Sequence, residues 1–233
     1  MSFLITVVVP VLNRQKNVAP FLNSFLANTP KDRAEVLFVT SNSCQDEINE
    51  IKKFEGPIHI GIAPDEVLSW AKRINWGINY SENNTKLDSP STWVLCAADD
   101  VVFHPNWLEE AEKAAKDFNG VIATNDLGSH AVMVGQHATH PLVSRKYVKE
   151  QGTVDEAGKF LHEGYRHNYV DLELVATAKK RNAFKAALDC KVEHFHPSWK
   201  KAEWDNVYQI GQDHLNQDRQ LWVNRSNKFN LKA

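Results

Sequence analysis

Short apolar runs alternate with segments of helical periodicity through the first half of the chain. Four runs have the length and composition of buried strands, at residues 3–9, 34–40, 58–62 and 93–97. Apolar residues recur at helical spacing near 18–26 and 68–78, and a further helix is expected to open at Pro105. This alternation predicts βαβ units and an α/β fold with a mainly parallel, doubly wound sheet.

Polar clusters follow three of the predicted strands at their carboxyl ends. They are Pro10–Arg14 after the first strand, Ser41–Ser43 after the second and Asp99–Asp100 after the fourth. In doubly wound sheets, ligands bind beyond the carboxyl ends of the strands. The three clusters are therefore expected to converge on one ligand site.

The pattern is looser after residue 120. Short strands are expected at 121–123 and 141–144, a helix at 169–181, and two strands at 184–189 and 191–195. The tail from residue 199 onward is polar with scattered Trp, and we expect it to be helical in part.

Composition and charge exclude several classes of protein. Hydrophobic residues make up 42% of the 233 residues and charged residues 24%, which is typical of globular proteins and excludes disordered and fibrous ones. The formal net charge of −2 gives no overall basic field of the kind that attracts nucleic acid. Residues 1–140 carry 11 Lys and Arg against 17 Asp and Glu, whereas residues 141–233 carry 16 against 12. A polyanionic partner would therefore meet the second half.

Cysteine usage and hydropathy indicate the compartment. Cys44, Cys96 and Cys190 are odd in number, widely spaced and form no C-x-x-C pair, which argues against a disulfide framework or a zinc ribbon. The apolar start lacks the basic region and cleavage site of a signal peptide, and no stretch approaches the ~18–20 apolar residues of a membrane helix. We expect a soluble, cytoplasmic protein with no membrane association.

Several common catalytic and nucleotide-binding motifs are absent from the sequence. No G-x-G-x-x-G follows the first strand, and G-x-x-x-x-G-K-[ST], G-x-S-x-G and H-E-x-x-H do not occur. These absences disfavour dinucleotide-binding proteins, phosphate-loop NTPases, α/β-hydrolases and zinc proteases.

The strongest local signal is the pair Asp99–Asp100 at the end of the fourth predicted strand. Adjacent carboxylates repel each other unless a cation or hydrogen-bond donors neutralise them. Mg²⁺ and Mn²⁺ take oxygen ligands and commonly lie between carboxylates and substrate phosphates. The pair therefore indicates a metal site, and the alternative is a loop pair that caps the helix opening near Pro105.

Asp171 and Glu173 lie two residues apart near the start of the helix predicted at 169–181. At this spacing the two side chains point in different directions, so that one can face a site while the other caps the helix or is solvated. A partly desolvated aspartate can serve as a general base. The alternative is that both acids only favour the helix dipole.

His194 and His196 share one face if the last predicted strand forms. Either imidazole can join a carboxylate-held metal, and mixed nitrogen and oxygen ligation favours Mn²⁺ over Mg²⁺. The chain has 10 histidines, so the alternative that neither of these two binds a metal stays open.

Taken in order, these segments resemble a family 2 glycosyltransferase of the GT-A fold. The resemblance is carried by Val7–Asn13, Glu35–Ser43, Asn75–Ile78, Ala98–Asp100 with Pro105 and Trp107–Leu108, Val170–Leu174, and Val192–His194. It implies a Rossmann-like GT-A domain at 3–200, with a nucleotide-binding half at 3–118, a looser acceptor half at 119–200 and a C-terminal extension at 201–233. The compact form is most similar to small stand-alone members encoded by bacteriophages.

The resemblance implies a donor site built from the first half of the chain. Pro10 and Asn13 would border the nucleotide, Asp99 would face the ribose, and Asp100 would hold Mn²⁺ or Mg²⁺. Ser41 stands where the family often has an acidic residue that contacts the donor's base, and this departure leaves the nucleotide open. A UDP-sugar is the expected donor.

The resemblance also implies roles for three residues of the second half. Asp171 would be the general base, and His194 or His196 would approach the metal, with the family pattern favouring His194. Two departures accompany these matches: Ala98 replaces the first acid of the commoner D-x-D form, and Val170 replaces the usual glutamate before the base.

Three functional classes remain open. The favoured one is a metal-dependent inverting glycosyltransferase that moves a sugar from a nucleotide-sugar donor to an acceptor hydroxyl. The others are a nucleotidyltransferase or phosphohydrolase, and a non-catalytic module that binds a sugar or a nucleotide sugar. The presence of both the acidic pair and Asp171 favours an enzyme, because binding alone needs no base.

Basic and aromatic residues of the second half indicate which acceptor to expect. A rim of this kind can contact phosphates and stack on bases; its members would be Arg145, Lys146, Lys179, Lys180, Arg181, Trp199, Lys200, Lys201 and Trp204. The alternative is that these are ordinary solvated side chains. With the phage-like form, the rim predicts a hydroxylated base in phage DNA as the acceptor, and a cell-surface glycan is the alternative. The oligomeric state stays open.

Overall fold

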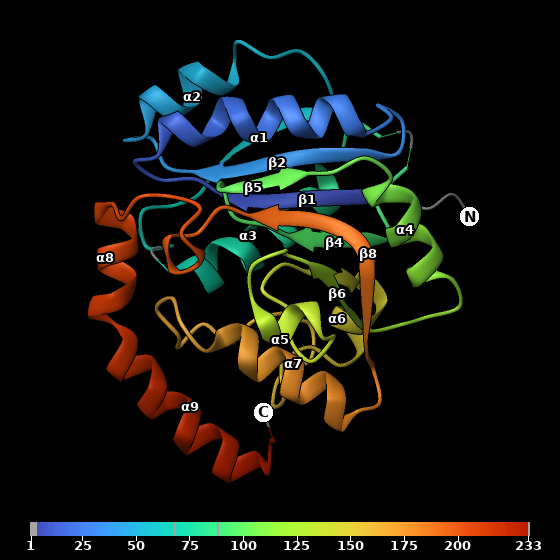
Figure 1. Ribbon diagram of the computed structural model, residues 1–233, viewed down its shortest axis with the longest axis vertical. Helices are drawn as coiled ribbons and strands as arrows, with labels where there is room; N and C mark the ends of the chain where they lie inside the picture. Colours follow the sequence, from blue (N-terminus) through green and yellow to red (C-terminus); the bar gives the residue numbers. More distant parts are fainter. Residues whose placement is uncertain (1–3, 68, 88, 233) are drawn as a thin grey trace.

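A computed structural model describes residues 4–67, 69–87 and 89–232, and Figure 1 shows a central sheet with helices on both faces. Phe3 and Leu68, which we placed at the start of a strand and of a helical stripe, lie outside the described residues. The elements are β1 Ile5–Pro10, α1 Gln15–Asn28, β2 Ala34–Thr40, α2 Gln45–Ile51, β3 Ile58–Ile62, α3 Trp70–Asn83, β4 Trp93–Cys96, β5 Val101–Phe103, α4 Trp107–Ala115, β6 Val121–Asn125, α5 His130–Met133, β7 Pro141–Ser144, α6 Arg145–Glu150, α7 Val170–Lys180, β8 Phe184–His194, a 3₁₀ turn Pro197–Trp199, α8 Asn206–Asp213 and α9 Leu215–Phe229.

The sheet confirms the predicted α/β class. Its strand order is β3-β2-β1-β4-β7-β6-β8-β5, and β3, β2, β1 and β4 are parallel to one another. The second half is mixed, because β7 is antiparallel to both β4 and β6, whereas β8 is parallel to β6. The four parallel strands place the carboxyl ends of β1, β2 and β4 at one edge, where the predicted ligand site lies.

The parallel half is held by a core on each face of the sheet. All seven residues of β2 are buried, as expected for a strand covered on both sides. On the face covered by α1 and α2, Phe21 and Phe25 make edge-to-face contacts with Phe38 and Phe103 at centroid distances of 5.3–5.4 Å. Helix α3 covers the opposite face and packs against β1 and β2.

The structure departs from the sequence-based predictions at several elements. The strands predicted at 184–189 and 191–195 form one strand, β8, which carries a register shift opposite Thr124 and Asn125 and then pairs with β5. The helix expected to open at Pro105 begins at Trp107 instead, because Asn106 adopts a left-handed conformation with φ 65°. The short helix α2 and strand β5 were not predicted.

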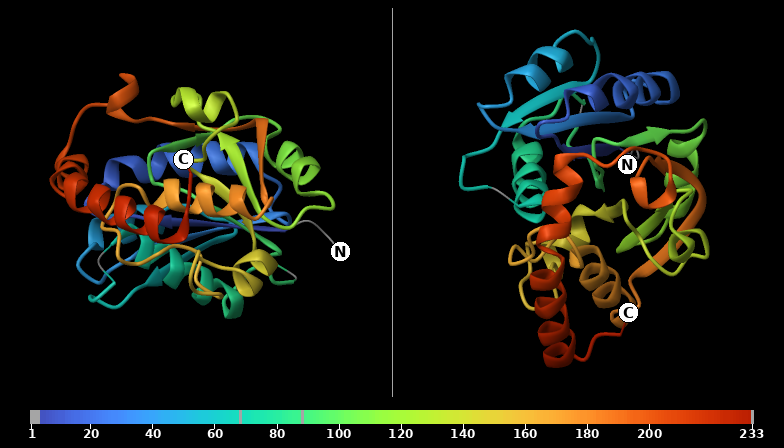
Figure 2. Two further views of the ribbon diagram at one scale, coloured as in Figure 1. Left: turned by 90° about the horizontal axis from the view of Figure 1, so that it is seen from below. Right: turned by 60° about the vertical axis from the view of Figure 1, so that its left-hand side comes forward.

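The C-terminal tail forms α8 and α9, which confirms that it is helical in part. Figures 1 and 2 show both helices along the side of the molecule, with α9 beside α7. Asp218 of α9 accepts hydrogen bonds from the backbone N–H groups of Arg166, His167 and Asn168 at 2.7–2.8 Å. The tail is thereby tied to the loop that precedes α7.

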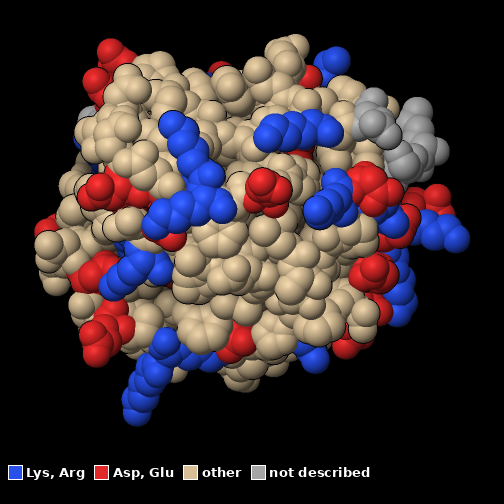
Figure 3. All heavy atoms as spheres, turned by 90° about the horizontal axis from the view of Figure 1, so that it is seen from above, with Lys and Arg blue, Asp and Glu red and all other residues tan. Residues whose placement is uncertain are grey.

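Charge distribution and helix hydropathy complete the description of the fold. On the face seen in Figure 3, Lys and Arg side chains alternate with Asp and Glu, so the described residues on this face form no patch of one sign. Among the described ranges, no helix combines the length and the apolar character needed to cross a membrane.

We predict that Gly77→Ala destabilises the parallel half. A Cβ atom at residue 77 would lie 2.5 Å from Val8 Cγ1 and 2.8 Å from Val39 Cγ2, so α3 would have to move away from the sheet. Overpacking of this kind lowers the free energy of unfolding by about 1–3 kcal/mol. Urea denaturation measures the change, and Asn79→Ala on the exposed face of α3 is the control. Equal stability of Gly77→Ala and wild type would contradict the prediction.

Candidate active site

One large pocket lies at the carboxyl edge of the parallel strands. It has a volume of about 960 Å³ and is lined from the β1–α1 loop, the end of β4, the start of α3, the α5–β7 loop, α7 and α8. Pro10, Asn13, Asp99 and Asp100 line this pocket, as do Asp171, His194 and His196. The first and third predicted clusters therefore meet at this pocket, whereas residues 41–43 do not line it.

Ser41 does not lie among the described residues that line this pocket. It is 4% exposed, and its hydroxyl lies 2.8 Å from the Ser43 hydroxyl and 3.4 Å from Cys44 Sγ. A smaller polar cleft beside it is lined by Asn13, Ser43 and Glu47, among others. Ser41 therefore supports the wall next to this cleft.

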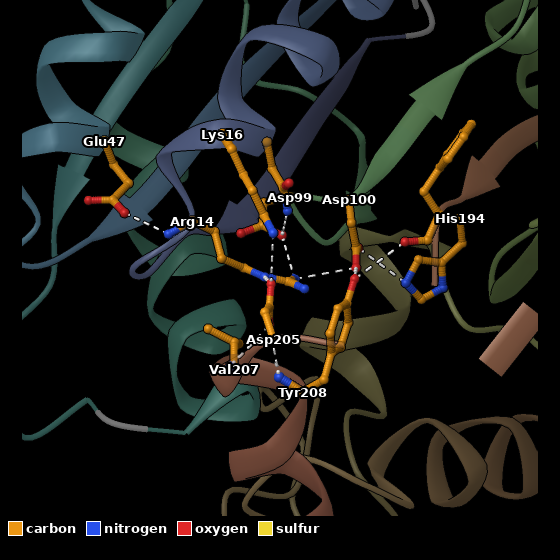
Figure 4. A network of polar contacts seen from close by, with 11 residues as sticks. Arg14, Lys16, Glu47, Asp99, Asp100, His194, Asp205, Val207 and Tyr208 are labelled. Atoms are coloured by element: carbon orange, nitrogen blue, oxygen red, sulfur yellow. Dashed lines mark hydrogen bonds and ion pairs between the residues drawn. The ribbon is translucent and has the colours of Figure 1, made fainter. Parts of the chain in front are cut away.

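The acidic pair is buried in the turn between β4 and β5. Asp99 is 4% exposed and Asp100 9%. Nη1 of Arg14 lies 2.9 Å from Asp99 Oδ1 and 3.3 Å from Asp100 Oδ2 (Figure 4). The side-chain amide of Asn17 also donates to Asp99 Oδ1, at 3.1 Å. Side chains of the protein itself therefore offset the repulsion between the two adjacent carboxylates.

The two carboxyl groups differ in their affinity for protons. Burial and the adjacent Asp100 charge raise the pKa of Asp99 to about 7, and Arg14 opposes this shift. Burial alone would raise the pKa of Asp100, but the imidazole of His194 and the Arg14 guanidinium hold it below its ordinary value. Asp100 therefore keeps its negative charge more readily than Asp99.

The residues around Asp100 fit a hard cation that takes further ligands from water and substrate. His194 Nε2 lies 3.1 Å from Asp100 Oδ1, yet this buried oxygen has no aligned hydrogen-bond partner in the described part of the chain. No group of three or more His, Cys, Asp and Glu side chains within the described ranges is arranged to hold a metal. Mg²⁺-type sites often use only one or two carboxylates together with substrate phosphates, and Asp100 suits such a site.

The two predicted histidines have different partners. The ring of His194 faces Asp100, whereas Nδ1 of His196 accepts a hydrogen bond from Ser198 N at 3.1 Å. Their ring centroids are 5.2 Å apart, and His196 also packs edge-on against the Tyr208 ring. His140, which was not predicted, is 3% exposed with its ring 4.5 Å from that of His194.

Asp171 faces the pocket and is paired with a histidine that the sequence did not single out. Nε2 of His137 lies 3.0 Å from Asp171 Oδ2, and the backbone N–H of Leu172 donates to Oδ1 at 2.8 Å. Burial would raise the pKa of Asp171, but the His137 contact and the backbone hydrogen bond lower it. The pKa of His137 is raised, because the carboxylate outweighs the effect of burial.

Glu173 points away from this pocket, in agreement with the predicted difference between the two acids. It is 3% exposed, and its carboxylate accepts hydrogen bonds from Arg225 at 2.7 and 2.9 Å and from the Tyr165 hydroxyl at 2.8 Å. Glu173 therefore joins α7 to α9 and is a structural residue.

Arg73 is a buried residue of α3 that lines the pocket, not a solvated residue on the helix surface. It is 4% exposed on α3 and lines the pocket, and Nε and Nη1 have no hydrogen-bond partner within the described ranges. Unpaired buried N–H groups are unfavourable unless a ligand accepts from them. Arg73 is therefore suited to an anionic or carbonyl group of a bound molecule. The adjacent Lys72 is not among the described lining residues.

Most of the basic residues proposed as a rim form hydrogen bonds to other parts of the chain. Arg145 donates to Ser81, Ser91 and the Ile78 carbonyl, and Arg181 donates to the carbonyls of Gly152 and Thr153. The Lys180 and Lys201 ammonium groups donate to the Phe229 and Leu127 carbonyls, respectively. Of the rim residues, only Lys179 appears among the described lining residues of the pocket. The rim therefore gives no support to a nucleic-acid acceptor.

Comparison with known proteins identifies the family. Residues 6–167 match the family described as glycosyl transferase family 2. The chain belongs to this family. No curated protein sequence matches it.

Solved structures share the GT-A fold with this family member. TarS residues 1–349 from S. aureus in complex with UDP has 15% sequence identity and a TM-score of 0.64, over 82% of this chain and 59% of that one. A mannosyltransferase from Pyrobaculum calidifontis in complex with GDP-Man and Mn²⁺ has 14% identity and a TM-score of 0.59, over 83% and 57%. A mycobacterial protein has 12% identity and a TM-score of 0.57, over 88% and 70%. The chain thus spans less than three fifths of the first two structures.

We predict that Glu173→Ala destabilises the fold, whereas Asp171→Asn does not. Removing the Glu173 carboxylate leaves the Arg225 guanidinium, 11% exposed, with Asp155 as its remaining ion-pair partner. Breaking a buried pair from one side costs ~3 kcal/mol or more, and Asp155 keeps the loss near this lower limit. Thermal or urea unfolding measures both variants. A loss of stability confined to Asp171→Asn would show that the two roles are reversed.

Proposed function

We propose that this protein is a metal-dependent inverting glycosyltransferase that moves a sugar from a nucleotide-sugar donor to an acceptor hydroxyl. The observation that carries the proposal is that the acidic pair and Asp171 face one pocket at the carboxyl edge of a family 2 fold. A protein that only binds a nucleotide sugar needs no carboxylate across the pocket from the acidic pair. An enzyme that removes a proton from an acceptor hydroxyl needs a base such as Asp171.

The donor would lie across the parallel strands. Asp99 would contact the ribose, and Arg73, whose Nε and Nη1 have no partner within the described ranges, would donate to an acceptor atom of the nucleotide. Asp100, with His194 beside it, would hold Mn²⁺ or Mg²⁺. When bound, such an ion neutralises the charge that develops on the diphosphate leaving group. A UDP-sugar is the proposed donor, as in the TarS complex with UDP, and a GDP-sugar is the alternative, as in the mannosyltransferase complex with GDP-Man.

Asp171 would act on the opposite side of the sugar. Its Oδ2 is held by His137, and its side chain is 30% exposed toward the pocket, so an acceptor hydroxyl can reach the carboxylate. Proton transfer to Asp171 would let the hydroxyl oxygen attack the anomeric carbon as the bond to the diphosphate breaks. Attack from the side opposite the leaving group inverts the configuration at that carbon.

Two acceptors are proposed as alternatives. A hydroxylated base in phage DNA was the first expectation, and a surface glycan the second. Because the basic rim is largely used in internal contacts, the DNA proposal now rests on the sequence resemblance to phage-encoded members alone. Parallel transfer assays with hydroxymethylated DNA, unmodified DNA and oligosaccharides distinguish these acceptors.

We predict that donor binding and transfer require the metal and Asp100. A panel of nucleotide sugars is screened by isothermal titration with and without Mn²⁺, and donor hydrolysis is followed by release of free sugar. Asp100→Ala should abolish metal-dependent donor binding while the fold persists. Unchanged turnover in EDTA would contradict this prediction, and attack on the nucleotide instead of the sugar would favour a nucleotidyltransferase or phosphohydrolase.

We predict that Asp171→Asn lowers turnover by at least ~10²-fold, since it removes the base but keeps its shape. Donor affinity should change little, because the metal and nucleotide contacts remain. Glu173→Gln should cost much less. If Asp171→Asn kept near-wild-type transfer while Glu173→Gln was inactive, the assignment of the base to Asp171 would be wrong.

We predict that His137→Ala shifts the acid limb of the kcat/KM profile to higher pH. The contact with His137 lowers the pKa of Asp171, so its loss raises this pKa, and the base is then protonated over a wider range. His137→Gln, whose amide can still donate, should restore much of the wild-type profile. A fall in turnover without a shift of the limb would mean that His137 only shapes the pocket.

A further inference from the structure

We propose that Arg14 is a built-in counter-cation of the acidic pair, held in place by Asp205 and Tyr208, and that a divalent cation bound at Asp100 displaces it. This inference rests on the proposed function for the identity of the ligand. It assigns a positioning role to the β1–α1 loop and to α8.

Arg14 is buried in the pocket and ion-paired on more than one side. Its guanidinium is 6% exposed and pairs with three carboxylates: Asp99 at 2.9 Å, Asp100 at 3.3 Å and, through Nε, Asp205 at 3.2 Å. The backbone fixes its starting point, because Asn13 turns with φ 52° and the Arg14 N–H donates to Glu47 Oε1 at 2.7 Å. Figure 4 shows the guanidinium between the acidic pair and Asp205.

The start of α8 locks this arrangement from the other side. The Tyr208 hydroxyl donates to Asp100 Oδ2 at 2.6 Å, and the Tyr208 ring lies 4.0 Å from the Arg14 guanidinium carbon. Asp205 caps α8 by accepting from the backbone N–H groups of Val207 and Tyr208 at 3.1 and 3.2 Å. Since Asp205 also binds Arg14, the same residue begins the helix and holds the guanidinium.

These contacts occupy one of the two carboxylate oxygen atoms of Asp100. Oδ2 of Asp100 already receives Arg14 and Tyr208, and only Oδ1, beside His194, has no aligned hydrogen bond. A divalent cation on Asp100 would place like charges next to each other at short range, which favours departure of the guanidinium. Metal binding and the present position of Arg14 therefore oppose each other.

The displaced guanidinium would remain within the pocket, on a loop fixed by Asn13 and Glu47. A nucleoside diphosphate is the anion that arrives together with the metal, and Arg pairs with phosphate oxygens through two parallel hydrogen bonds. Arg14 would thus exchange carboxylate partners for phosphate partners. Its loss should then have opposite effects on the two ligands: tighter binding of the metal alone and weaker binding of the nucleotide.

The test measures Mn²⁺ affinity of the intact chain without donor, by isothermal titration or by the EPR signal of free Mn²⁺. Arg14→Gln should bind Mn²⁺ at least 10-fold more tightly than wild type, and Tyr208→Phe several-fold more tightly. UDP affinity at saturating Mn²⁺ should fall at least 10-fold in Arg14→Gln. Lys16→Gln is the matched control, because Lys16 also pairs with Asp205, at 3.4 Å, but is 67% exposed and should change neither affinity.

Two outcomes overturn the proposal. One is an unchanged or weaker Mn²⁺ affinity in Arg14→Gln, and the other is an increase that Lys16→Gln reproduces. If Arg14→Gln does not fold, Arg14→Lys and Tyr208→Phe decide: the lysine variant should keep wild-type Mn²⁺ affinity, and a wild-type affinity in Tyr208→Phe overturns the lock. These outcomes can be distinguished from failure of the proposed function, because Arg14→Gln can show a rise in Mn²⁺ affinity even if the protein binds no nucleotide sugar.

Discussion

Two adjacent carboxylates buried at the end of a strand set the main electrostatic demand on this molecule. Asp99 and Asp100 are each at least 91% removed from solvent, where unpaired charges are strongly unfavourable. Arg14, Asn17, His194 and Tyr208 meet this demand from three separate segments. The β1–α1 loop, the end of β8 and helix α8 are therefore fixed relative to one another by the charge that the site must hold.

The two halves of the sheet divide the work of building the site. Parallel strands bring the loop after β1 and the turn after β4 to one edge, which is where doubly wound sheets bind ligands. The mixed half adds the opposite wall, because the long strand β8 turns back to pair with β5 and carries His194 toward Asp100. Helix α7 then presents Asp171 to the pocket while Glu173 joins α7 to α9.

The sequence predicted those parts that depend on local pattern. Alternating apolar runs identified β1 to β4 and the edge where the acidic pair lies, and the spacing of Asp171 and Glu173 predicted their divergence. Residues recruited by tertiary contact escaped prediction. Arg14 lay in a marked polar cluster but had no signal for its pairing, since Asp205 and Tyr208 are about 190 residues away along the chain. The continuous strand β8 depends on a register shift that has no sequence signature.

The central claim is that Asp100 receives a metal and a nucleotide diphosphate at the carboxyl edge of the sheet. A crystal structure of the protein grown with Mn²⁺ and UDP tests it most directly, with anomalous scattering used to locate the metal. The account predicts a Mn²⁺ peak bonded to Asp100 and to diphosphate oxygens, with Asp99 near the ribose. A metal bound elsewhere, or UDP bound away from the acidic pair, would contradict it.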